Sequence, residues 1–250
     1  MAMAESRLRA EIFPMPYEGV MRLRHKIAGR DPLFPSANSY AQERGGGIYD
    51  AVVTEIGYTP DIYSMTAGCV RSICEVLDIC GGSNALEMGA GISTLSTARY
   101  FRDRADGGGR VTSLEQDAEH AGRVRGWLAD LDVSDRASVM LAPLTPCKVG
   151  EVDTATFDAK ALASEMDAAG PFDLLVIDGP KAGGAGGNPH SRFPVPIMFR
   201  QWMADGALLL LDDAFRDMEM VAIKSWVEQD LIAPIGFSVE GKGFFAGRFR

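Results

Sequence analysis

The sequence is poor in the residues that build metal centres, disulfide scaffolds and nucleic-acid interfaces. Its four cysteines form no Cys-x-x-Cys pair and its three histidines are scattered, so neither a zinc site nor a disulfide framework is expected. Lysine and arginine total 25 against 34 aspartates and glutamates, which gives a net charge of −9. Because a nucleic-acid binder needs a basic surface to displace counterions, DNA and RNA are not expected partners.

Long apolar runs are also missing. No run approaches the roughly 18 to 20 residues that a membrane helix requires, and charged residues near the N-terminus stand where a signal peptide needs its apolar stretch. We therefore expect a soluble, cytoplasmic protein with no membrane partner. The 250 residues are 46% hydrophobic and 24% charged, which is typical of one globular domain with a sizeable core.

From about residue 64 onward, apolar runs typical of strands alternate with helical patterns. This alternation predicts β-α-β units and an α/β fold, doubly wound around a mostly parallel seven-stranded sheet. Strands are expected at 173–177 and 207–211, where LLVI (174–177) and ALLLL (207–211) are apolar throughout, as is typical of strands that are covered on both faces. The other expected strands are 85–88, 111–115 and 138–141. The expected helices are 64–80, one from 93, 118–130, near 159–169, near 193–203 and 218–230.

The two ends of the chain do not show this alternation of strands and helices. At 236–249, two short apolar runs surround a glycine-bearing turn, which predicts an antiparallel C-terminal hairpin at the edge of the sheet. Residues 1–60 hold several prolines and one short helical pattern at 17–27. Because a segment this small cannot form its own core, we expect a helical cap on the domain formed by 61–250, or a contact between the subunits of a homodimer.

A glycine-bearing loop follows the first expected strand. In ALEMGAGIST (85–94), the strand turns on Gly89 and Gly91, which allow close approach of a ligand, and then enters a helix. Thr94 replaces the third glycine of dinucleotide-binding loops, and no P-loop motif occurs. Glu87 would repel a pyrophosphate, so the loop suits an ammonium or sulfonium ligand. A glycine turn without a ligand is the alternative.

A second acid, Glu115, ends the strand expected at 111–115. A carboxylate at this place can accept hydrogen bonds from both hydroxyls of a ribose. An ordinary solvated acid before a helix is the alternative when Glu115 is taken alone. Together with Glu87 and the two glycines, it predicts a crevice that binds a positively charged nucleoside.

The segments ALEMGAGIST, VTSLEQD, FDLLVIDGP and ALLLLDDA, in this order, resemble the motifs of class I S-adenosylmethionine-dependent methyltransferases. The resemblance is strongest to small O-methyltransferases of the catechol O-methyltransferase type, and it covers about residues 60–250. It implies a Rossmann-like methyltransferase fold. It also implies methyl transfer from S-adenosylmethionine to a hydroxyl of a small molecule, such as a catechol or a natural product.

The resemblance also implies which residues bind the cofactor. Glu115 would hold the ribose, Gln116 would lie against adenine or ribose, and Pro143 with Leu144 would border adenine. Relatives often place an acid or amide near Leu144, which this chain lacks. Ser64 would close over the cofactor, or would instead be the N-cap of the following helix. The full implied set is Ser64, Met65, Glu87, Gly89, Gly91, Ser93, Glu115, Gln116, Pro143, Leu144 and Asp178.

Three acids follow the last two expected parallel strands: Asp178 after one, and Asp212 with Asp213 after the other. Ligands bind outside the carboxyl ends of parallel strands, so these carboxylates should face the crevice of the glycine loop. Their repulsion can be offset by a divalent cation, by raised pKa values or by a basic partner. The candidate basic partners are Lys181, Arg192 and Arg216.

In catechol-type enzymes, an acid and an Asp-Asn pair at the corresponding places bind magnesium. The resemblance therefore implies Asp178, Asp212 and Asp213 as ligands of Mg²⁺ or Mn²⁺. Asp213 departs from the family asparagine, and many relatives with acids here use no metal.

Methyl transfer requires an acceptor placed in line with the sulfonium methyl group and, for a hydroxyl acceptor, a base that takes its proton. The candidate bases are Asp178, Lys181 and His190. His190 ends a glycine-rich loop that would act as a lid over the site, or would be an ordinary surface connection.

Three alternatives stay open on the sequence. A nicotinamide-dependent Rossmann oxidoreductase is disfavoured by Thr94 and Glu87. A non-catalytic binding module could retain the same fold. A nitrogen or macromolecular acceptor is disfavoured by the missing basic surface and by the Ile-Asp-Gly-Pro sequence at 177–180, where an Asn-Pro-Pro-Tyr-like motif would stand.

Overall fold

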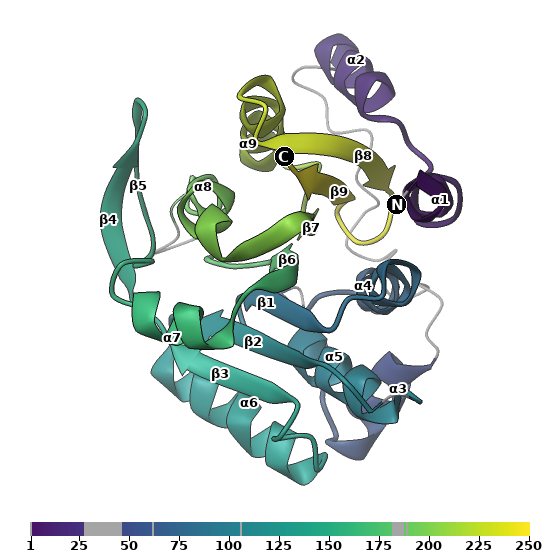
Figure 1. Ribbon diagram of the computed structural model, residues 1–250, viewed down its shortest axis with the longest axis vertical. Coiled ribbons are helices and arrows are strands. Elements are labelled where there is room, and N and C mark those ends of the chain that lie inside the picture. Colours follow the sequence, from purple (N-terminus) through teal and green to yellow (C-terminus); the bar gives the residue numbers. More distant parts are fainter. Residues whose placement is uncertain (1, 28–46, 62, 106, 182–187, 189) are drawn as a thin grey trace.

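The main sheet has the strand order β3-β2-β1-β6-β7-β9-β8. The computed structural model (Figure 1) describes residues 2–27, 47–61, 63–105, 107–181, 188 and 190–250. The parallel strands are β1 (Asn84–Met88), β2 (Arg110–Glu115), β3 (Ala137–Leu141), β6 (Phe172–Ile177) and β7 (Met203–Leu211). β9 (Phe244–Phe249) is antiparallel to both β7 and β8 (Ile232–Ser238). The predicted mostly parallel seven-stranded sheet with an antiparallel C-terminal hairpin is therefore confirmed.

Residues 174–177 of β6 and 207–211 of β7 are apolar throughout because helices cover both faces of the sheet. In β6, Leu174 and Val176 pack into one core layer, while Leu175 and Ile177 pack into the other. The first layer contains α4 (Ala67–Cys80), α5 (Ile92–Asp103) and α6 (Ala118–Asp130). The second contains α7 (Ala163–Ala169), α8 (Val195–Phe199) and α9 (Asp217–Glu228). Among the residues described, no helix is long and apolar enough to cross a membrane.

The order of the strands determines where a ligand can bind. From β1 the chain moves through β2 to β3 on one side, and it then returns to pair β6 with the other edge of β1. The loops after β1 and β6 therefore leave the sheet in opposite directions. This switch point opens a crevice at the carboxyl ends of the two strands.

The N-terminal segment packs directly on this domain. It contains α1 (Ala2–Arg7), a π-helical turn at Leu8–Ile12, α2 (Tyr17–Ile27) and α3 (Ile48–Glu55). Arg9 donates hydrogen bonds to the backbone oxygens of Ile235 (2.5 Å) and Pro234 (2.9 Å) in β8. Leu8, Ile12, Phe13 and Val52 belong to the same core layer as α4 and α5. The segment thus contributes to the main core as well as covering it.

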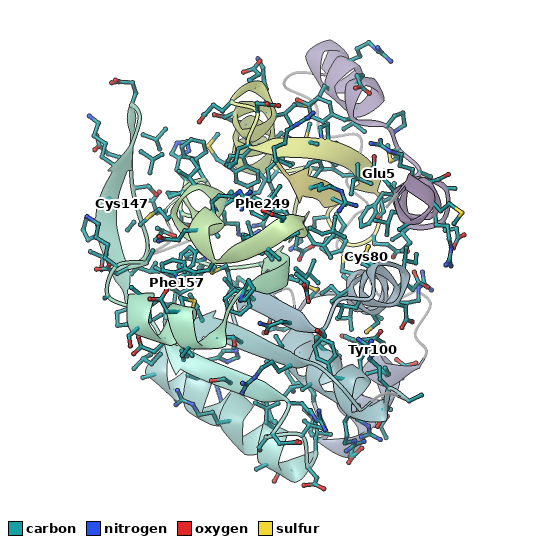
Figure 2. The ribbon with its side chains drawn as sticks, in the orientation of Figure 1. Glu5, Cys80, Tyr100, Cys147, Phe157 and Phe249 are labelled. Atoms are coloured by element: carbon teal, nitrogen blue, oxygen red, sulfur yellow. The ribbon has the colours of Figure 1, made fainter. Side chains whose placement is uncertain are left out.

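An antiparallel hairpin absent from our expectations is formed by β4 (Leu144–Val149) and β5 (Val152–Phe157). It projects from the body of the molecule (Figure 1), with Cys147 on the projecting part and Phe157 where β5 returns to the body (Figure 2). The sequence did not indicate this hairpin, because proline argues against a strand in the middle of a sheet and β4 contains Pro146. Both strands also contain alternating polar residues.

Three helices begin or end elsewhere than expected. α4 begins at Ala67, because Thr66 is the N-cap and its Oγ1 accepts a hydrogen bond from Cys69 N (3.4 Å). The N-cap role considered for Ser64 was therefore wrong. α7 begins at Ala163 rather than near 159. The helix expected near 193–203 is only α8 followed by a 3-10 turn at Arg200–Trp202, because Met203 pairs with Phe172 and joins β7.

Candidate active site

A cavity of about 820 Å³ opens at the carboxyl ends of β1, β2, β6 and β7. One half is formed by the loops after β1 and β2, and the other by the loops after β6 and β7. The lining residues are Tyr63, Ser64, Gly89, Ala90, Glu115, Gln116, Asp117, His120, Arg123, Phe157, Asp178, Gly179, Pro180, Lys181, Arg192, Asp212, Asp213, Arg216, Asp217, Met218, Glu219 and Lys242.

The loop after β1 requires glycine at Gly89. Its φ of +94° lies in a region that other residues rarely adopt, and a Cβ at this position would lie 3.0 Å from the backbone nitrogen of Gly179. Gly89 N donates to Leu114 O (2.8 Å), which ties the loop to β2. The backbone of the loop therefore passes close to the end of β6 and stays open toward the cavity.

Glu87 lies beneath this loop and is not among the residues that line the cavity. Its Oε2 accepts hydrogen bonds from Ser113 Oγ and Thr94 Oγ1, both at 2.5 Å. Thr94 Oγ1 in turn accepts from Gly91 N (3.0 Å). Burial raises the pKa of Glu87 to about 7, although hydrogen bonds from Ser113, Ser93 and Thr94 oppose the shift. The carboxylate and Thr94 thus fix the start of α5.

Glu115 faces the cavity from the end of β2. Its Oε2 accepts from Ala90 N (3.1 Å) and its Oε1 from Asp117 N (2.8 Å). These two backbone donors orient the carboxylate and leave further lone pairs on both oxygens. Beside it, Gln116 Oε1 is buried with no hydrogen-bond partner in the described part of the chain. A buried orphan acceptor in a cavity wall favours a ligand that supplies a donor.

The other half of the cavity contains the acids that follow β6 and β7. The carboxylates of Asp178, Asp212 and Asp213 each place an oxygen within 4.8 Å of the others. Burial raises the pKa of Asp178 to about 6, and it raises that of Asp212 well above its ordinary value, with the Asp213 charge adding to both shifts.

Arg192 occupies the middle of these acids and is itself buried. Its Nη1 lies 3.3 Å from Asp213 Oδ2 and 3.1 Å from Asp212 O. Its Nη2 lies 3.5 Å from Asp178 Oδ1 and also donates to the backbone oxygen of Asp178. Of the three basic partners considered from the sequence, Arg192 and Arg216 contact the acids, since Arg216 Nη1 lies 2.7 Å from Asp213 Oδ2.

Lys181 lines the cavity and contacts an aromatic ring rather than the acid cluster. Its Nζ lies 5.1 Å from the ring centroid of Tyr63, in a cation–π arrangement. Tyr63 and the neighbouring Ser64 come from the segment before α4, and Ser64 Oγ is 2.6 Å from Tyr58 Oη. This segment therefore brings an aromatic ring and a hydroxyl to the same wall as Lys181.

The structure brings most of the predicted site residues to the cavity. Ser64, Gly89, Glu115, Gln116, Asp178, Lys181, Asp212 and Asp213 line it. The remaining predicted residues are not among those lining it: Met65 and Ser93 are buried in the core, Gly91 and Glu87 belong to the loop and its support, and Pro143, Leu144 and His190 lie outside its wall. Most of the proposed lid, 182–187 and 189, lies outside the described residues.

Sequence reasoning did not name several residues of the cavity wall. His120, in the first turn of α6, has Nε2 2.9 Å from Ala90 O and braces the glycine loop; its place just after Glu115 was a usable signal. Phe157 enters from the unpredicted hairpin. Lys242 comes from the β8–β9 turn, which is tied to the loop after β7 by a hydrogen bond from Phe215 N to Lys242 O (3.1 Å). Its Nζ lies 3.6 Å from Asp213 Oδ1.

No protein-family model and no curated protein matches the sequence. Solved structures do match. A methyltransferase of Podospora anserina, PaMTH1 bound to SAH, aligns with a TM-score of 0.59 at 15% identity, covering 96% of this chain and 99% of that one. An O-methyltransferase of Bacillus cereus in complex with SAH gives 0.55 at 18% identity, with 85% and 94% covered.

A third solved structure is TomG, an O-methyltransferase of Streptomyces achromogenes involved in tomaymycin synthesis, in complex with SAM. It gives a TM-score of 0.54 at 15% identity, and the alignment covers 85% of this chain and 94% of that one. At such identities the likeness establishes the fold. The chain has the Rossmann-like methyltransferase fold that its sequence predicted.

Proposed function

We propose that this protein is an S-adenosylmethionine-dependent methyltransferase that acts on a hydroxyl of a small molecule. One observation carries the proposal. A single cavity joins the glycine loop and Glu115, which suit a nucleoside, to the Asp178–Lys181 wall, which suits an acceptor and its proton. Structural neighbours that are named as O-methyltransferases with SAH or SAM bound support it.

The adenosine part of the cofactor fits the first half of the cavity. Glu115 retains lone pairs for two ribose hydroxyls after its bonds to Ala90 N and Asp117 N. Gln116 Oε1, which lacks a partner among the described residues, would accept from the adenine amine or a ribose hydroxyl. Pro143 and Leu144, at the start of the hairpin whose end bears Phe157, stay proposed as neighbours of adenine.

The sulfonium end would lie toward Asp178, between the two halves. A carboxylate there attracts the positive sulfur, while Gly89 leaves room for close approach. Gly91, Ser93, Met65 and Glu87 would act by shaping the loop and its support rather than through the cavity wall. Ser64 stays proposed as a cofactor contact because it lines the cavity.

Proton removal from the acceptor falls to Lys181 in this proposal. Its amine lines the cavity and rests on the Tyr63 ring. The neutral amine of a lysine can act as a general base. Asp178 is the second candidate, and His190 is a third that would require movement toward the cavity. A cytoplasmic location, a homodimer and the absence of a nucleic-acid partner complete the proposal, and the net charge of −9 supports the last of these.

The test is transfer of a labelled methyl group from S-adenosylmethionine to a panel of phenols, catechols and hydroxylated natural products. We expect label in at least one hydroxyl acceptor. Binding of S-adenosylhomocysteine without transfer to any acceptor would favour a non-catalytic module. Quenching of NADH fluorescence without binding of S-adenosylhomocysteine would favour an oxidoreductase.

A further inference from the structure

The guanidinium of Arg192 occupies the centre of the acid cluster. The guanidinium is surrounded by four carboxylates, those of Asp178, Asp212, Asp213 and Glu219. Arg192 lies within 3.3 to 3.7 Å of three of them: 3.5 Å from Asp178, 3.3 Å from Asp213 and 3.7 Å from Glu219. It also donates to the backbone oxygens of Asp212 and Asp178, which directly follow β7 and β6. One buried cation therefore joins the two strand ends.

A divalent cation does not fit these residues as they stand. Mg²⁺ requires oxygen ligands at about 2.0 to 2.1 Å in octahedral geometry. The Asp178 and Asp213 oxygens that would supply them already face guanidinium nitrogens. Asp213 is further paired on both oxygens, with Arg216 at Oδ2 (2.7 Å) and Lys242 at Oδ1 (3.6 Å). A metal would have to displace Arg192 and sit beside two more positive charges.

We propose that Arg192 is the resident cation of this site, in the place that Mg²⁺ or Mn²⁺ would take, and that it closes the acid cluster to divalent metals. Arginine suits this role because its planar guanidinium carries five donors in a fixed geometry and stays charged when buried. Arg192 is thus a positioning residue, which holds the carboxyl ends of β6 and β7 at the cavity.

A consequence for the acceptor rests on the proposed function. A divalent metal would bind two neighbouring oxygens of an acceptor together. With Arg192 in its place, no metal bridges vicinal hydroxyls, so the acceptor class includes molecules with a single hydroxyl. The metal claim itself is independent of methyl transfer, because it is measured as binding.

The test is Mn²⁺ binding by electron paramagnetic resonance to EDTA-treated protein, with wild type, Arg192→Ala, Arg192→Lys and Arg200→Ala compared. Arg200→Ala is the matched control, because it removes an arginine that bonds to Arg250 O outside the cavity. We expect no micromolar site in wild type, Arg192→Lys or Arg200→Ala. Arg192→Ala should bind Mn²⁺ at least about tenfold more tightly than wild type, and Asp212→Asn added to it should abolish the gain.

Micromolar Mn²⁺ binding by wild type that is lost in Asp212→Asn would overturn the proposal, and so would an Arg192→Ala variant that folds and binds no better than wild type. If Arg192→Ala does not fold, wild type and Arg192→Lys still test the proposal. Mn²⁺ binding at the acid cluster by either protein would contradict the claim that a cation at position 192 excludes divalent metals. Failure of methyl transfer leaves these binding results unaffected. If transfer occurs, EDTA should not reduce it, and a monohydroxyl phenol should be methylated as well as a catechol of the same scaffold.

Discussion

Gly89 and Gly179 meet backbone to backbone where the loops after β1 and β6 diverge. A Cβ added to Gly179 would lie 2.9 Å from Gly89 Cα and 3.0 Å from Met88 O. Neither position has room for a side chain without movement of main chain. The contact brings the glycine loop against the Asp178 wall, so the two halves of the cavity depend on it.

Gly179→Ala is expected to destabilise the protein, because backbone atoms must move to admit the methyl group. Overpacking of this kind typically costs about 1 to 3 kcal/mol. Thermal and urea unfolding measure the loss. The control is Gly122→Ala in α6, where an added Cβ meets nothing within 4 Å and helix propensity favours alanine by about 0.5 to 1 kcal/mol. Equal stability of Gly179→Ala and wild type would contradict the contact.

Glu87 should make the stability of the ligand-free protein depend on pH. Its pKa rises from 4.5 in the unfolded chain to about 7 in the fold. Between these values the native state holds a proton that the unfolded state lacks, so stability falls as pH rises through the window, by about 3 kcal/mol in total. Glu87→Gln keeps a neutral oxygen acceptor for the hydroxyls of Ser113 and Thr94, and should be more stable than wild type at about pH 8.

The measurement is the free energy of unfolding by urea from about pH 4 to about pH 8. The free energy of unfolding of wild type minus that of Glu87→Gln should fall with rising pH as predicted. Glu119→Gln, on the exposed start of α6, is the control and should follow wild type. A Glu87→Gln curve parallel to that of wild type would show that this carboxyl keeps an ordinary pKa.

Lys181→Met should reduce methyl transfer by about 100-fold or more, since general base catalysis contributes on that scale. Binding of S-adenosylhomocysteine should not change. Lys181→Arg separates proton removal from charge, because arginine keeps the charge and cannot accept the proton; it should be as inactive as Lys181→Met. Lys160→Met, on an exposed lysine, is the control. Full activity of Lys181→Met would transfer the role to Asp178 or His190.

Arg9→Ala should loosen the N-terminal segment from the domain. The guanidinium donates to two backbone oxygens of β8, and loss of these bonds is expected to cost about 1 to 3 kcal/mol. Arg7→Ala is the control, because Arg7 pairs only on the surface with Glu11. Limited proteolysis should cut Arg9→Ala faster than Arg7→Ala within the first residues, and equal rates would mean that the hydrogen bonds of Arg9 do not hold the segment.

The parallel strands could be predicted because burial on both faces leaves a continuous apolar run, as at Leu174–Ile177. Asp178 could be placed at the cavity because it directly follows such a run, and Glu115 because it ends an expected strand. The β4–β5 hairpin could not, since it lies outside the main sheet and its strands contain Pro146 and alternating polar residues. The sequence also did not determine which basic residue pairs with the acid cluster. Which of Lys181, Arg192 and Arg216 enters the centre depends on how the chain between β6 and α8 folds back.

The most direct test of the account is calorimetric titration of S-adenosylhomocysteine into wild type and Glu115→Ala. Ala90 N and Asp117 N orient the carboxylate of Glu115, which we propose accepts hydrogen bonds from a ribose. Loss of two charge-assisted hydrogen bonds should weaken binding by about 100-fold or more. Wild type should bind and Glu115→Ala should bind at least that much more weakly. No binding by wild type, or equal affinity in the two proteins, would contradict the assignment of this cavity to a sulfonium nucleoside.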